Sequence, residues 1–438
     1  MKIQTKVAVL LAASSLILSG CSKKTGEESE GDNAANGSDI VTELSEETTV
    51  TFWHTLSDHH EEHLQQMVAE FEAEHENMRI ELQAQPLTDF DSKLLQAVRN
   101  GTGPNMTTGY PNTASQFIDA DLLVNLTPYV EHGQIGIPEM KDSILEGVYE
   151  EATQWDGQMY IFPRARTGEV LFYNKTVYDE LGLEVPTTWE ELAENSRVIT
   201  EAKGKPAFGF DSEVDGAILL LQQKGGDLFD VEKMVSGANS PEAHEVFEEL
   251  RPLYEEGVYR LVGEDQYFSN PFGAEAIYSY IGSSAGFGFV EDAVDGSFEI
   301  GVAPVPQIDG GEPYVNSWGG FGMVFNGTPE ENLVAYTFFK WAEMEPEVAA
   351  EASVAFGSVP IAHAARETEV FQNFLAEEPA MIALSESLEN VGYLPAVRGS
   401  QVGREAFARA TQSILVGSSD IDEALEIAES ETNEAMTE

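Results

Sequence analysis

The sequence predicts an α/β protein with a mostly parallel sheet flanked by helices. From residue 46 onward, short segments rich in β-branched and aromatic residues alternate with longer segments whose apolar residues recur at helical spacing. Such βαβα alternation is typical of parallel sheets covered by helices. With 438 residues, of which 42% are hydrophobic, the chain is long enough for two or three domains and a substantial core.

The individual elements follow from local patterns. The expected strands cover residues 49–53, 79–83, 169–173, 276–281 and 301–305. The first expected helix begins after Ser57 or Asp58 and carries apolar residues at helical spacing between 64 and 71. The other expected helices cover residues 91–98, 330–342 and 419–435, and a further helix begins near residue 189. Ser57 or Asp58 is expected to cap the first helix, and Thr188 the helix near residue 189. No internal repeat is visible.

Residues 1–20 predict a signal peptide. Lys2 and Lys6 precede a mostly apolar run, residues 7–18, which is shorter than the ~20 residues that a membrane span needs. The following Leu18-Ser19-Gly20-Cys21 resembles the cleavage box of bacterial lipoproteins, so lipid is expected on the thiol of Cys21. An ordinary signal peptide with an incidental cysteine is the alternative. Cys21 is the only cysteine, which excludes an internal disulfide.

Residues 21–45 are expected to form a flexible acidic linker, because they contain almost no apolar side chains that could be buried. The whole chain is strongly acidic, with 77 acidic and 23 basic residues and a formal net charge of -54. The acidic residues are spread along the sequence, which favours a surface adapted to salty surroundings. No basic stripe exists, so nucleic acid is excluded as a partner.

An ordered set of short motifs resembles the family-one solute-binding proteins of ABC importers. The motifs are Thr51-Phe52-Trp53-His54, Phe162-Pro163, Val170-Leu171-Phe172-Tyr173-Asn174-Lys175, Leu181-Gly182-Leu183, Pro186-Thr187-Thr188-Trp189-Glu190-Glu191-Leu192, Gly301-Val302-Ala303-Pro304-Val305-Pro306, Ser317-Trp318-Gly319-Gly320, Phe338-Phe339-Lys340-Trp341 and Gly357-Ser358-Val359-Pro360. They occur in family order over residues 50–400. Each motif is weakly specific, but the ordered set is strongly so.

The resemblance implies a two-lobe periplasmic-binding-protein fold of type II, with hinge strands joining the lobes and a ligand cleft between them. Lobe 1 would comprise residues 46–165 plus 302–345, and lobe 2 residues 166–301 plus 346–438. The implied ligands are sugars, oligosaccharides and glycerol 3-phosphate or its diesters. The implied partners are the permease subunits of an ABC importer and, through the lipid, a membrane. The protein is expected to be an extracytoplasmic monomer without enzymatic activity or cofactor. No G-x-x-x-x-G-K-[ST] motif occurs, which agrees with energy supplied by partner subunits.

Three aromatic residues are candidates at strand ends. Trp53 and His54 end the first strand, where the ring of Trp53 could stack on a sugar or simply lie in the core. Tyr110 lies at the turn between a short strand and a helix that begins near Pro111, a position at which this family presents side chains to its ligand.

The segment Pro163-Arg164-Ala165-Arg166-Thr167 matches the family's hinge. Arg164 and Arg166 are two residues apart, so an extended strand would turn both to the same side. Arginine binds carboxylate and phosphate oxygens in a bidentate manner, which favours an anionic ligand such as a polyol phosphate. The alternative is that both arginines pair with the surplus carboxylates of the protein.

The remaining candidates come from other strand ends and motifs. Asp211 could accept hydrogen bonds from hydroxyl groups, and Ser283 and Ser284 end a strand where a helix begins. The other positions matched to the family's ligand contacts are Thr167, Trp318, Gly319, Ser358 and Arg398. Glycine at 319 would allow close approach of the backbone to a ligand.

Two rival functions remain open. Gly282-Ser283-Ser284-Ala285-Gly286 fits the G-x-S-x-G pattern of a secreted serine esterase with Ser284 as nucleophile, for which His363 is the one histidine downstream. His59 and His63 are four residues apart on the expected first helix, a spacing compatible with a metal-capturing protein.

Overall fold

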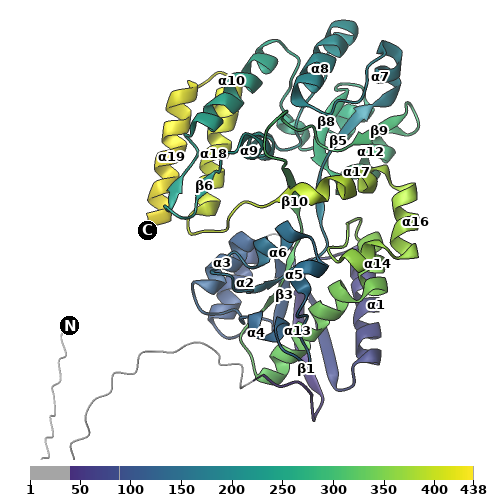
Figure 1. Cartoon of the computed structure of the whole chain (residues 1–438), viewed down its shortest axis with the longest axis vertical. Coiled ribbons are helices and arrows are strands. Elements are labelled where there is room, and N and C mark those ends of the chain that lie inside the picture. The colour runs from purple at the N-terminus through teal and green to yellow at the C-terminus, as the bar shows by residue number, and fades with distance from the viewer. Residues whose placement is uncertain (1–39, 88, 438) are drawn as a thin grey trace, which may run out of the picture. The chain divides into compact units, whose positions relative to one another are not determined.

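Two mixed sheets organise the protein, whose computed structural model describes residues 40–87 and 89–437 (Figure 1). The first sheet has the strand order β2-β1-β3-β11-β4. Its strands are β1 (Thr48–His54), β2 (Met78–Ala84), β3 (Met106–Gly109), β4 (Ile161–Phe162) and β11 (Phe321–Val324). β1 is parallel to β2 and β3, as predicted, whereas β11 is antiparallel to β3 and β4.

The second sheet has the order β12-β10-β5-β8, and β9 also pairs with β5. Its strands are β5 (Thr167–Asn174), β8 (Ser279–Ser283), β9 (Ile300–Ala303), β10 (Val315–Trp318) and β12 (Val391–Gly392). β5 is antiparallel to β8, β9 and β10, so the prediction of a mostly parallel sheet is wrong here. The long stretch between β5 and β8 contains several helices, so local alternation does not set their relative direction.

The helices around the first sheet come from two separate parts of the chain (Figure 1). They are α1 (Asp58–Glu74), α2 (Phe90–Arg99), α3 (Pro111–Ile118), α4 (Thr127–Val130), α5 (Met140–Ser143), α6 (Glu146–Ala152), α13 (Pro329–Met344) and α14 (Pro346–Ala355). The short α15 (His363–Arg366) and α16 (Glu369–Glu377) then lead the chain toward the second sheet.

The helices around the second sheet likewise join a middle segment to the C-terminal one. They are α7 (Lys175–Leu181), α8 (Trp189–Lys203), α9 (Glu213–Gln223), α10 (Pro241–Glu255), α11 (Ser269–Gly273), α12 (Phe287–Val294), α17 (Pro379–Ser387), α18 (Ser400–Leu415) and α19 (Ile421–Thr437). A small hairpin, β6 (Phe229–Asp230) with β7 (Val235–Ser236), contacts α19, and 3-10 turns cover Gly263–Asp265, Ser284–Gly286 and Leu388–Asn390.

Helix caps predicted from the sequence are only partly present. Thr188 forms the predicted cap of α8, with a reciprocal capping box to Glu191. Ser57 is the N-cap residue of α1, but its side chain makes no capping hydrogen bond. Among the described residues, no helix combines the length and apolar character needed to cross a membrane.

Two segments connect the two sheets, and a third, around Val359, lies beside them. Residues 163–166 lead from β4 of the first sheet to β5 of the second, and Gly319 and Gly320 lead from β10 back to β11. Trp318 pairs with Thr167, and Arg166 exchanges both backbone hydrogen bonds with Val359 at 2.8 Å each. These segments therefore lie side by side as a hinge, where the sequence places Pro163–Thr167.

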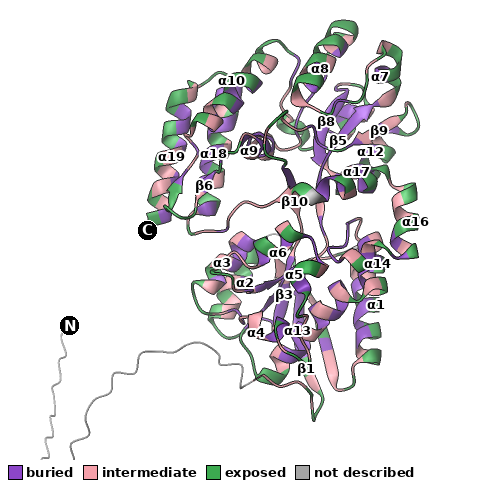
Figure 2. Cartoon of the chain, in the orientation of Figure 1, coloured by how far each residue is buried: buried purple, intermediate pink, exposed green. Residues whose placement is uncertain are grey.

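Burial follows the two sheets (Figure 2). Successive residues of β5 pack into different clusters. Val170 and Phe172 belong to a cluster that contains the core of the first sheet and also residues of β8, α11 and α12, and Leu171 and Tyr173 belong to the other cluster. Because successive side chains of a strand point to opposite faces, β5 is buried on both sides. This strand therefore anchors one end of the hinge rigidly.

The predicted lobe boundaries remain a prediction, but the strand pairing argues for moving two of them. β9 and β10 lie within the segment 302–345 or next to it, yet both hydrogen-bond to β5 in the second sheet. Conversely, α14 follows residue 345 but packs against α1 and α13. Pairing between distant strands, which local pattern does not reveal, determines these crossings.

Candidate functional site

Residues from both sheets line a cleft with two compartments at the hinge. We call them the polar compartment, with a volume of about 370 Å³, and the apolar compartment, with a volume of about 350 Å³. Both volumes fall in the range of small-molecule sites. Tyr110, Trp318 and Gly319 line both compartments and thus form the boundary between them.

Two ion pairs provide the charged groups of the polar compartment. Nη2 of Arg166 lies 2.6 Å from Oε2 of Glu151, and Nη2 of Arg404 lies 2.6 Å from Oδ1 of Asp215. No other charged side chain lines this compartment among the described residues. Its lining therefore carries two positive and two negative groups.

Arg166 is held on several sides. Its side chain is 1% exposed, its guanidinium lies 4.4 Å from the ring centroid of Phe321, and Nη1 donates to the carbonyl of Gly319 at 3.4 Å. Burial raises the pKa of Glu151, and the positive charge of Arg166 opposes that rise. The pair therefore ties α6 of the first lobe to the hinge.

A glycine is required beside this arginine. A Cβ atom at Gly319 would lie 2.6 Å from the carbonyl oxygen of Ala165 and 2.9 Å from Cδ of Arg166. Any side chain here would push two hinge segments apart. The predicted close approach at Gly319 is thus to the neighbouring hinge segment.

Asn316 links the second ion pair to a buried carboxyl group. Its Nδ2 donates to Oε2 of Glu169 at 3.0 Å and to the carbonyl oxygen of Asp215 at 2.9 Å. Burial raises the pKa of Glu169 well above its ordinary value, and the charge of Asp215 adds to this effect. Burial therefore favours the uncharged form of the Glu169 carboxyl group, to which Asn316 is hydrogen-bonded.

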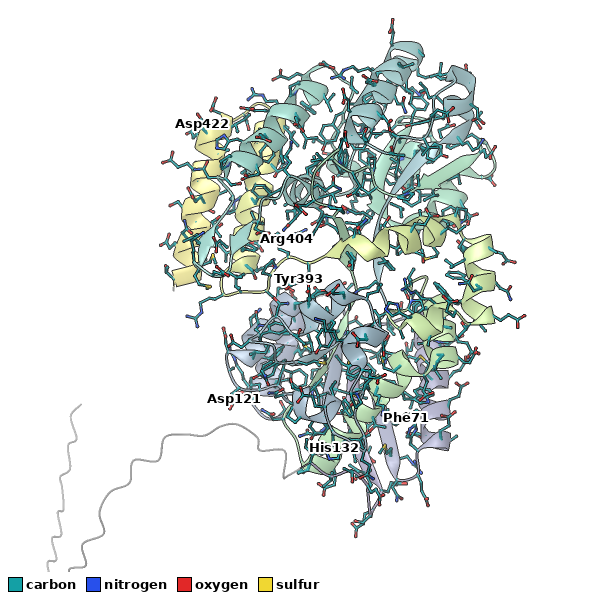
Figure 3. All side chains as sticks on the ribbon, in the orientation of Figure 1. Phe71, Asp121, His132, Tyr393, Arg404 and Asp422 are labelled. Carbon is teal, nitrogen blue, oxygen red and sulfur yellow. The ribbon has the colours of Figure 1, made fainter. Side chains whose placement is uncertain are left out.

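Aromatic side chains border the polar compartment on several sides. Tyr110 is 53% exposed, Trp318 is partly buried, and Tyr314 and Tyr393 complete the set. Figure 3 shows Tyr393 and Arg404 on the chain segment that runs from β12 into α18. These rings, next to polar groups, form a surface suited to a flat ligand with both apolar and hydrogen-bonding faces.

The segment between β12 and α18 contacts both lobes. The backbone N–H of Ala396 donates to Oε1 of Gln154 at 2.7 Å. Nδ2 of Asn112, at the start of α3, donates to Oε1 of Gln401 on α18 at 2.9 Å. Residues 392–396 line the polar compartment, so these contacts close one side of it.

The apolar compartment lies against the first lobe. Its apolar wall consists of Phe52, Leu56, Leu64, Met67, Phe338, Phe339, Ala342 and Phe356. Arg164 also lines it, but Nε of Arg164 lies 2.7 Å from Oε1 of Glu343, whose side chain is 5% exposed. Oε2 of Glu343 also accepts the backbone N–H of Ala165 at 3.0 Å.

The structure brings together eight of the residues that the sequence singles out. Tyr110, Trp318 and Gly319 line both compartments, and Arg166 lines the polar one. The residues that line only the apolar compartment are His54, Arg164, Thr167 and Ser358. Their contact with a ligand remains a prediction.

The two arginines do not act as a pair. The expectation that both face the same side is wrong, since Arg164 lines the apolar compartment and Arg166 the polar one. Residues 163–165 form no regular strand, so the two-residue periodicity does not apply to them. Each arginine pairs with a carboxylate of the protein, which is the alternative that the sequence left open.

Trp53 lies outside both compartments, whereas Phe52 and His54 line the apolar one. Neighbouring residues on a strand point to opposite faces, which explains the difference. Nε1 of Trp53 donates to Oε1 of Gln83 at 2.8 Å, and Nζ of Lys93 lies 5.4 Å from the centroid of its ring. Trp53 therefore packs on the far face of the sheet.

Asp211, Ser283 and Ser284 also lie outside both compartments. Oδ1 of Asp211 accepts the backbone N–H of Phe268 at 2.6 Å, and burial raises the pKa of Asp211 to about 7. Oγ of Ser284 accepts the N–H of Gly168 at 3.4 Å, and Ser284 is 1% exposed. Asp211 and Ser284 therefore form hydrogen bonds within the second lobe and do not face either compartment.

Arg398 is a surface residue. Its side chain is 56% exposed, and Nη2 lies 4.0 Å from Oδ2 of Asp119 in the first lobe. It lines neither compartment, and its contact with a ligand stays a prediction from the family match.

Sequence reasoning missed much of the polar compartment. Glu151, Asp215, Asn316, Tyr393 and Arg404 were not singled out. Alternation along β10 could have indicated Asn316, which is two residues from Trp318 and therefore on the same face. The other four come from α6, α9, the segment after β12 and α18, which only the tertiary fold brings together.

The rival functions gain no support. Ser284 is buried, and Nδ1 of His363 contacts Nη2 of Arg366 on α15 at 2.6 Å. In the described part of the chain, no group of three or more histidine, cysteine, aspartate or glutamate residues could hold a metal ion. The side chain of His59 lies outside the described residues, as do Cys21 and the predicted signal peptide.

Comparisons with known proteins connect this cleft to a family. Residues 66–381, more than half of the chain, match the family model described as bacterial extracellular solute-binding protein. The maltotriose-binding protein of Pyrococcus abyssi is 23% identical over 326 residues, which cover 71% of this chain and 66% of that protein. The sn-glycerol-3-phosphate-binding periplasmic protein UgpB of Agrobacterium fabrum is 24% identical over 256 residues, covering 55% and 57%. The matches thus span just under two thirds, or less, of these relatives' lengths.

A solved structure shares the fold. The cyclic α-maltosyl-1,6-maltose binding protein from Arthrobacter globiformis superposes with a TM-score of 0.78 at 24% identity, covering 89% of this chain and 99% of that chain. This likeness confirms the predicted two-lobe α/β fold of binding proteins, and the family match confirms a binding protein rather than an enzyme. The chain belongs to the bacterial extracellular solute-binding protein family.

Proposed function

We propose that this protein captures a neutral oligosaccharide in the cleft and delivers it to the permease of an ABC importer. The observation that carries the proposal is the charge balance of the polar compartment. Each of its two arginines is paired at 2.6 Å with a carboxylate that lines the same compartment. A ligand without net charge leaves both pairs intact.

A phosphate ligand would have to compete with these carboxylates. The negative charges of Glu151 and Asp215 would repel it, and breaking the buried pair of Arg166 with Glu151 would leave an uncompensated charge. Hydroxyl groups can instead donate to the carboxylates and accept from the guanidinium groups and from Asn112. The structure therefore argues for a neutral ligand and against the anionic ligand that the two hinge arginines suggested.

The aromatic border supports a sugar. Tyr110, Trp318 and Tyr393 offer ring faces next to hydrogen-bonding groups, which suits a pyranose ring with its apolar faces and polar edge. Among the relatives, one is named for maltotriose and another for glycerol 3-phosphate. The paired charges of this cleft favour the oligosaccharide.

Isothermal titration calorimetry of the mature protein tests the proposal. Maltose, maltotriose, cellobiose and arabinotriose should include at least one ligand with a Kd of about 10 μM or lower, whereas glycerol 3-phosphate should bind at least about 100-fold more weakly. Tight binding of glycerol 3-phosphate, with no binding of any of the four sugars, would contradict the neutral-ligand proposal.

The location of the protein follows from the family and from its N-terminal sequence. Family membership implies an extracytoplasmic protein. We further propose that lipid on Cys21 anchors a monomer to the cell membrane, with residues 21–45 as a spacer. The spacer keeps the binding protein close to its permease while the two lobes open and close.

A Cys21→Ala variant tests the anchor separately from the cleft. It should bind the same sugar with unchanged affinity but appear in the culture medium instead of the membrane fraction. Retention of the variant in the membrane fraction would contradict the lipid anchor. The high net charge of -54 is proposed to maintain solubility in salty surroundings, which light scattering over a range of salt concentrations would check.

A further inference from the structure

The apolar compartment differs from the polar one in the kind of atoms it offers. The aromatic rings of Phe52, Phe338, Phe339 and Phe356 and the side chain of Met67 form much of its wall. A sugar unit, whose hydroxyl groups all need hydrogen-bond partners, would find few of them here. The compartment is therefore suited to a group that is largely apolar.

Three of the polar side chains in this wall already have partners within the protein. Arg164 pairs with Glu343 at 2.7 Å, and Oγ1 of Thr167 donates to the carbonyl oxygen of Trp318 at 3.1 Å. Oγ of Ser358 donates to the carbonyl oxygen of Ser353 at 3.4 Å. These groups consequently contribute little to the recognition of a ligand.

His54 is different. The residue is 3% exposed, and its Nδ1 atom has no hydrogen-bond partner in the described part of the chain. Burial lowers the pKa of His54, an effect that the charge of Glu61 and a hydrogen bond between the ring and the backbone of Leu56 oppose. Buried polar atoms rarely lack a partner, since each unpaired one is destabilising. A ligand atom that reaches Nδ1 would supply the missing partner.

The two compartments adjoin each other. Tyr110, Trp318 and Gly319 line both, so the space of the polar compartment and that of the apolar one lie on either side of the same three residues. A group that enters the apolar compartment can thus be attached to a sugar in the polar compartment. Aromatic walls favour a flat ring, because rings pack edge-to-face or offset against one another.

We propose that the apolar compartment binds an aromatic aglycone of a glycoside whose sugar occupies the polar compartment, with Nδ1 of His54 bonding to a polar atom on that ring. This inference rests on the proposed neutral-sugar function and extends it to the class of ligand. The natural cargo would be an aryl glycoside in addition to a free oligosaccharide.

Matched pairs of compounds test the proposal by calorimetry on the mature protein. The pairs are maltose with 4-nitrophenyl α-maltoside and cellobiose with 4-nitrophenyl β-cellobioside. The aryl glycoside of at least one pair should bind about tenfold more tightly than its free sugar, because the ring is removed from water. The quantity to follow is the ratio of the two dissociation constants within a pair.

Two variants locate the effect in this compartment. Ala342→Leu narrows it, and His54→Phe removes the unpaired nitrogen but keeps a ring. Each should lower the ratio at least about threefold. The matched controls are Ala202→Leu on the exposed face of α8 and His132→Phe on the surface of the first lobe, which should keep the wild-type ratio. Circular dichroism and thermal unfolding verify that each variant is folded.

The outcomes separate this inference from the function on which it rests. If free sugars bind but the aryl glycosides bind no more tightly, the aglycone compartment is overturned and the neutral-sugar function stands. An affinity gain that persists in both Ala342→Leu and His54→Phe would also overturn it. Absence of binding by all four compounds, and also by maltotriose and arabinotriose, would contradict the sugar function itself, and the aglycone compartment with it.

Discussion

The polar and apolar compartments meet at Trp318, yet they are built from different parts of the molecule. Residues of both lobes line the polar compartment, since Glu151 comes from α6 and Arg404 from α18. The apolar compartment is lined by the first lobe and the hinge alone. A ligand in the polar compartment can therefore favour the closed arrangement of the lobes, whereas one in the apolar compartment adds affinity without joining them.

The two compartments also differ in the position of their ion pairs. In the polar one, both members of each ion pair line the cavity. In the apolar one, Glu343 pairs with Arg164 from behind the wall. The contrast indicates that the polar compartment presents fixed, compensated charges to hydroxyl groups, while the apolar compartment presents mainly carbon atoms. Three predictions test this contrast, in order of decreasing effect, and a fourth concerns a carboxyl group that lies outside both compartments.

Removing Arg166 should have the largest effect, and it should be on stability. Arg166→Ala leaves Glu151 buried without its partner, which typically costs about 3–5 kcal/mol. Urea unfolding measures the change. The double variant Arg166→Met with Glu151→Leu should recover at least half of the loss, because it replaces the pair with apolar groups. A loss below about 1 kcal/mol in Arg166→Ala would show that the pair does not hold the hinge.

Truncating the shared aromatic wall should weaken binding next most strongly. Trp318→Ala should raise the Kd for the preferred oligosaccharide about 30-fold, or about 2 kcal/mol, as expected for a central aromatic contact. Trp53→Phe is the matched control and should leave the Kd unchanged, since Trp53 lies outside both compartments. The reverse order of effects in calorimetry would contradict the assignment of the cleft.

Changing the charge of the polar compartment should change the kind of ligand it accepts. Asp215→Asn leaves Arg404 without its carboxylate, so the lining becomes positive by one charge. Glycerol 3-phosphate should then bind about tenfold more tightly than it does to the wild-type protein, about 1.4 kcal/mol. The matched variant Glu343→Gln should show no such gain, because Glu343 lies outside the polar compartment. An equal gain in both would mean that overall charge, and not this compartment, governs binding.

The smallest effect should appear in the pH dependence of stability. The pKa of Asp211 is raised to about 7 in the folded protein from an ordinary value of 3.8, so the folded state binds the proton more tightly than the unfolded state does. The contribution of Asp211 to stability is therefore full below pH 3.8 and declines as the pH rises toward 7. The buried histidines His54 and His63, whose pKa values are lowered, act in the opposite direction below pH 6.5.

An Asp211→Asn variant isolates the carboxyl group from the histidines. Its stability relative to the wild type should increase between pH 6 and 7 by an amount on the order of 1 kcal/mol, and level off above pH 7. Urea midpoints at pH 5, 6, 7 and 8 provide the measurement. A difference that stays constant over this range would show that the pKa of Asp211 is not raised.

Local patterns in the sequence determined the elements and the class of protein. The strand at 49–53, the helix that follows it and the cap at Thr188 depend on neighbouring residues, so periodicity and capping chemistry suffice to predict them. The ordered motifs were enough to identify the family because each is a short run of neighbouring residues that forms one turn or one strand. The hinge at Pro163–Thr167 was found in the same way.

Only the tertiary structure decided which side chains meet in the cleft. Arg166 pairs with Glu151, 15 positions away, and Arg404 with Asp215, 189 positions away, and neither pairing leaves a local signature. The directions of β8, β9 and β10 relative to β5 likewise depend on packing between distant segments. The sequence predicted two arginines near a ligand site. Each of them forms an ion pair with a carboxylate of the protein, and that carboxylate reduces the attraction of the arginine for an anionic ligand. Ion pairs between distant residues depend on the tertiary fold, so the proposal of a neutral ligand could be made only from the structure.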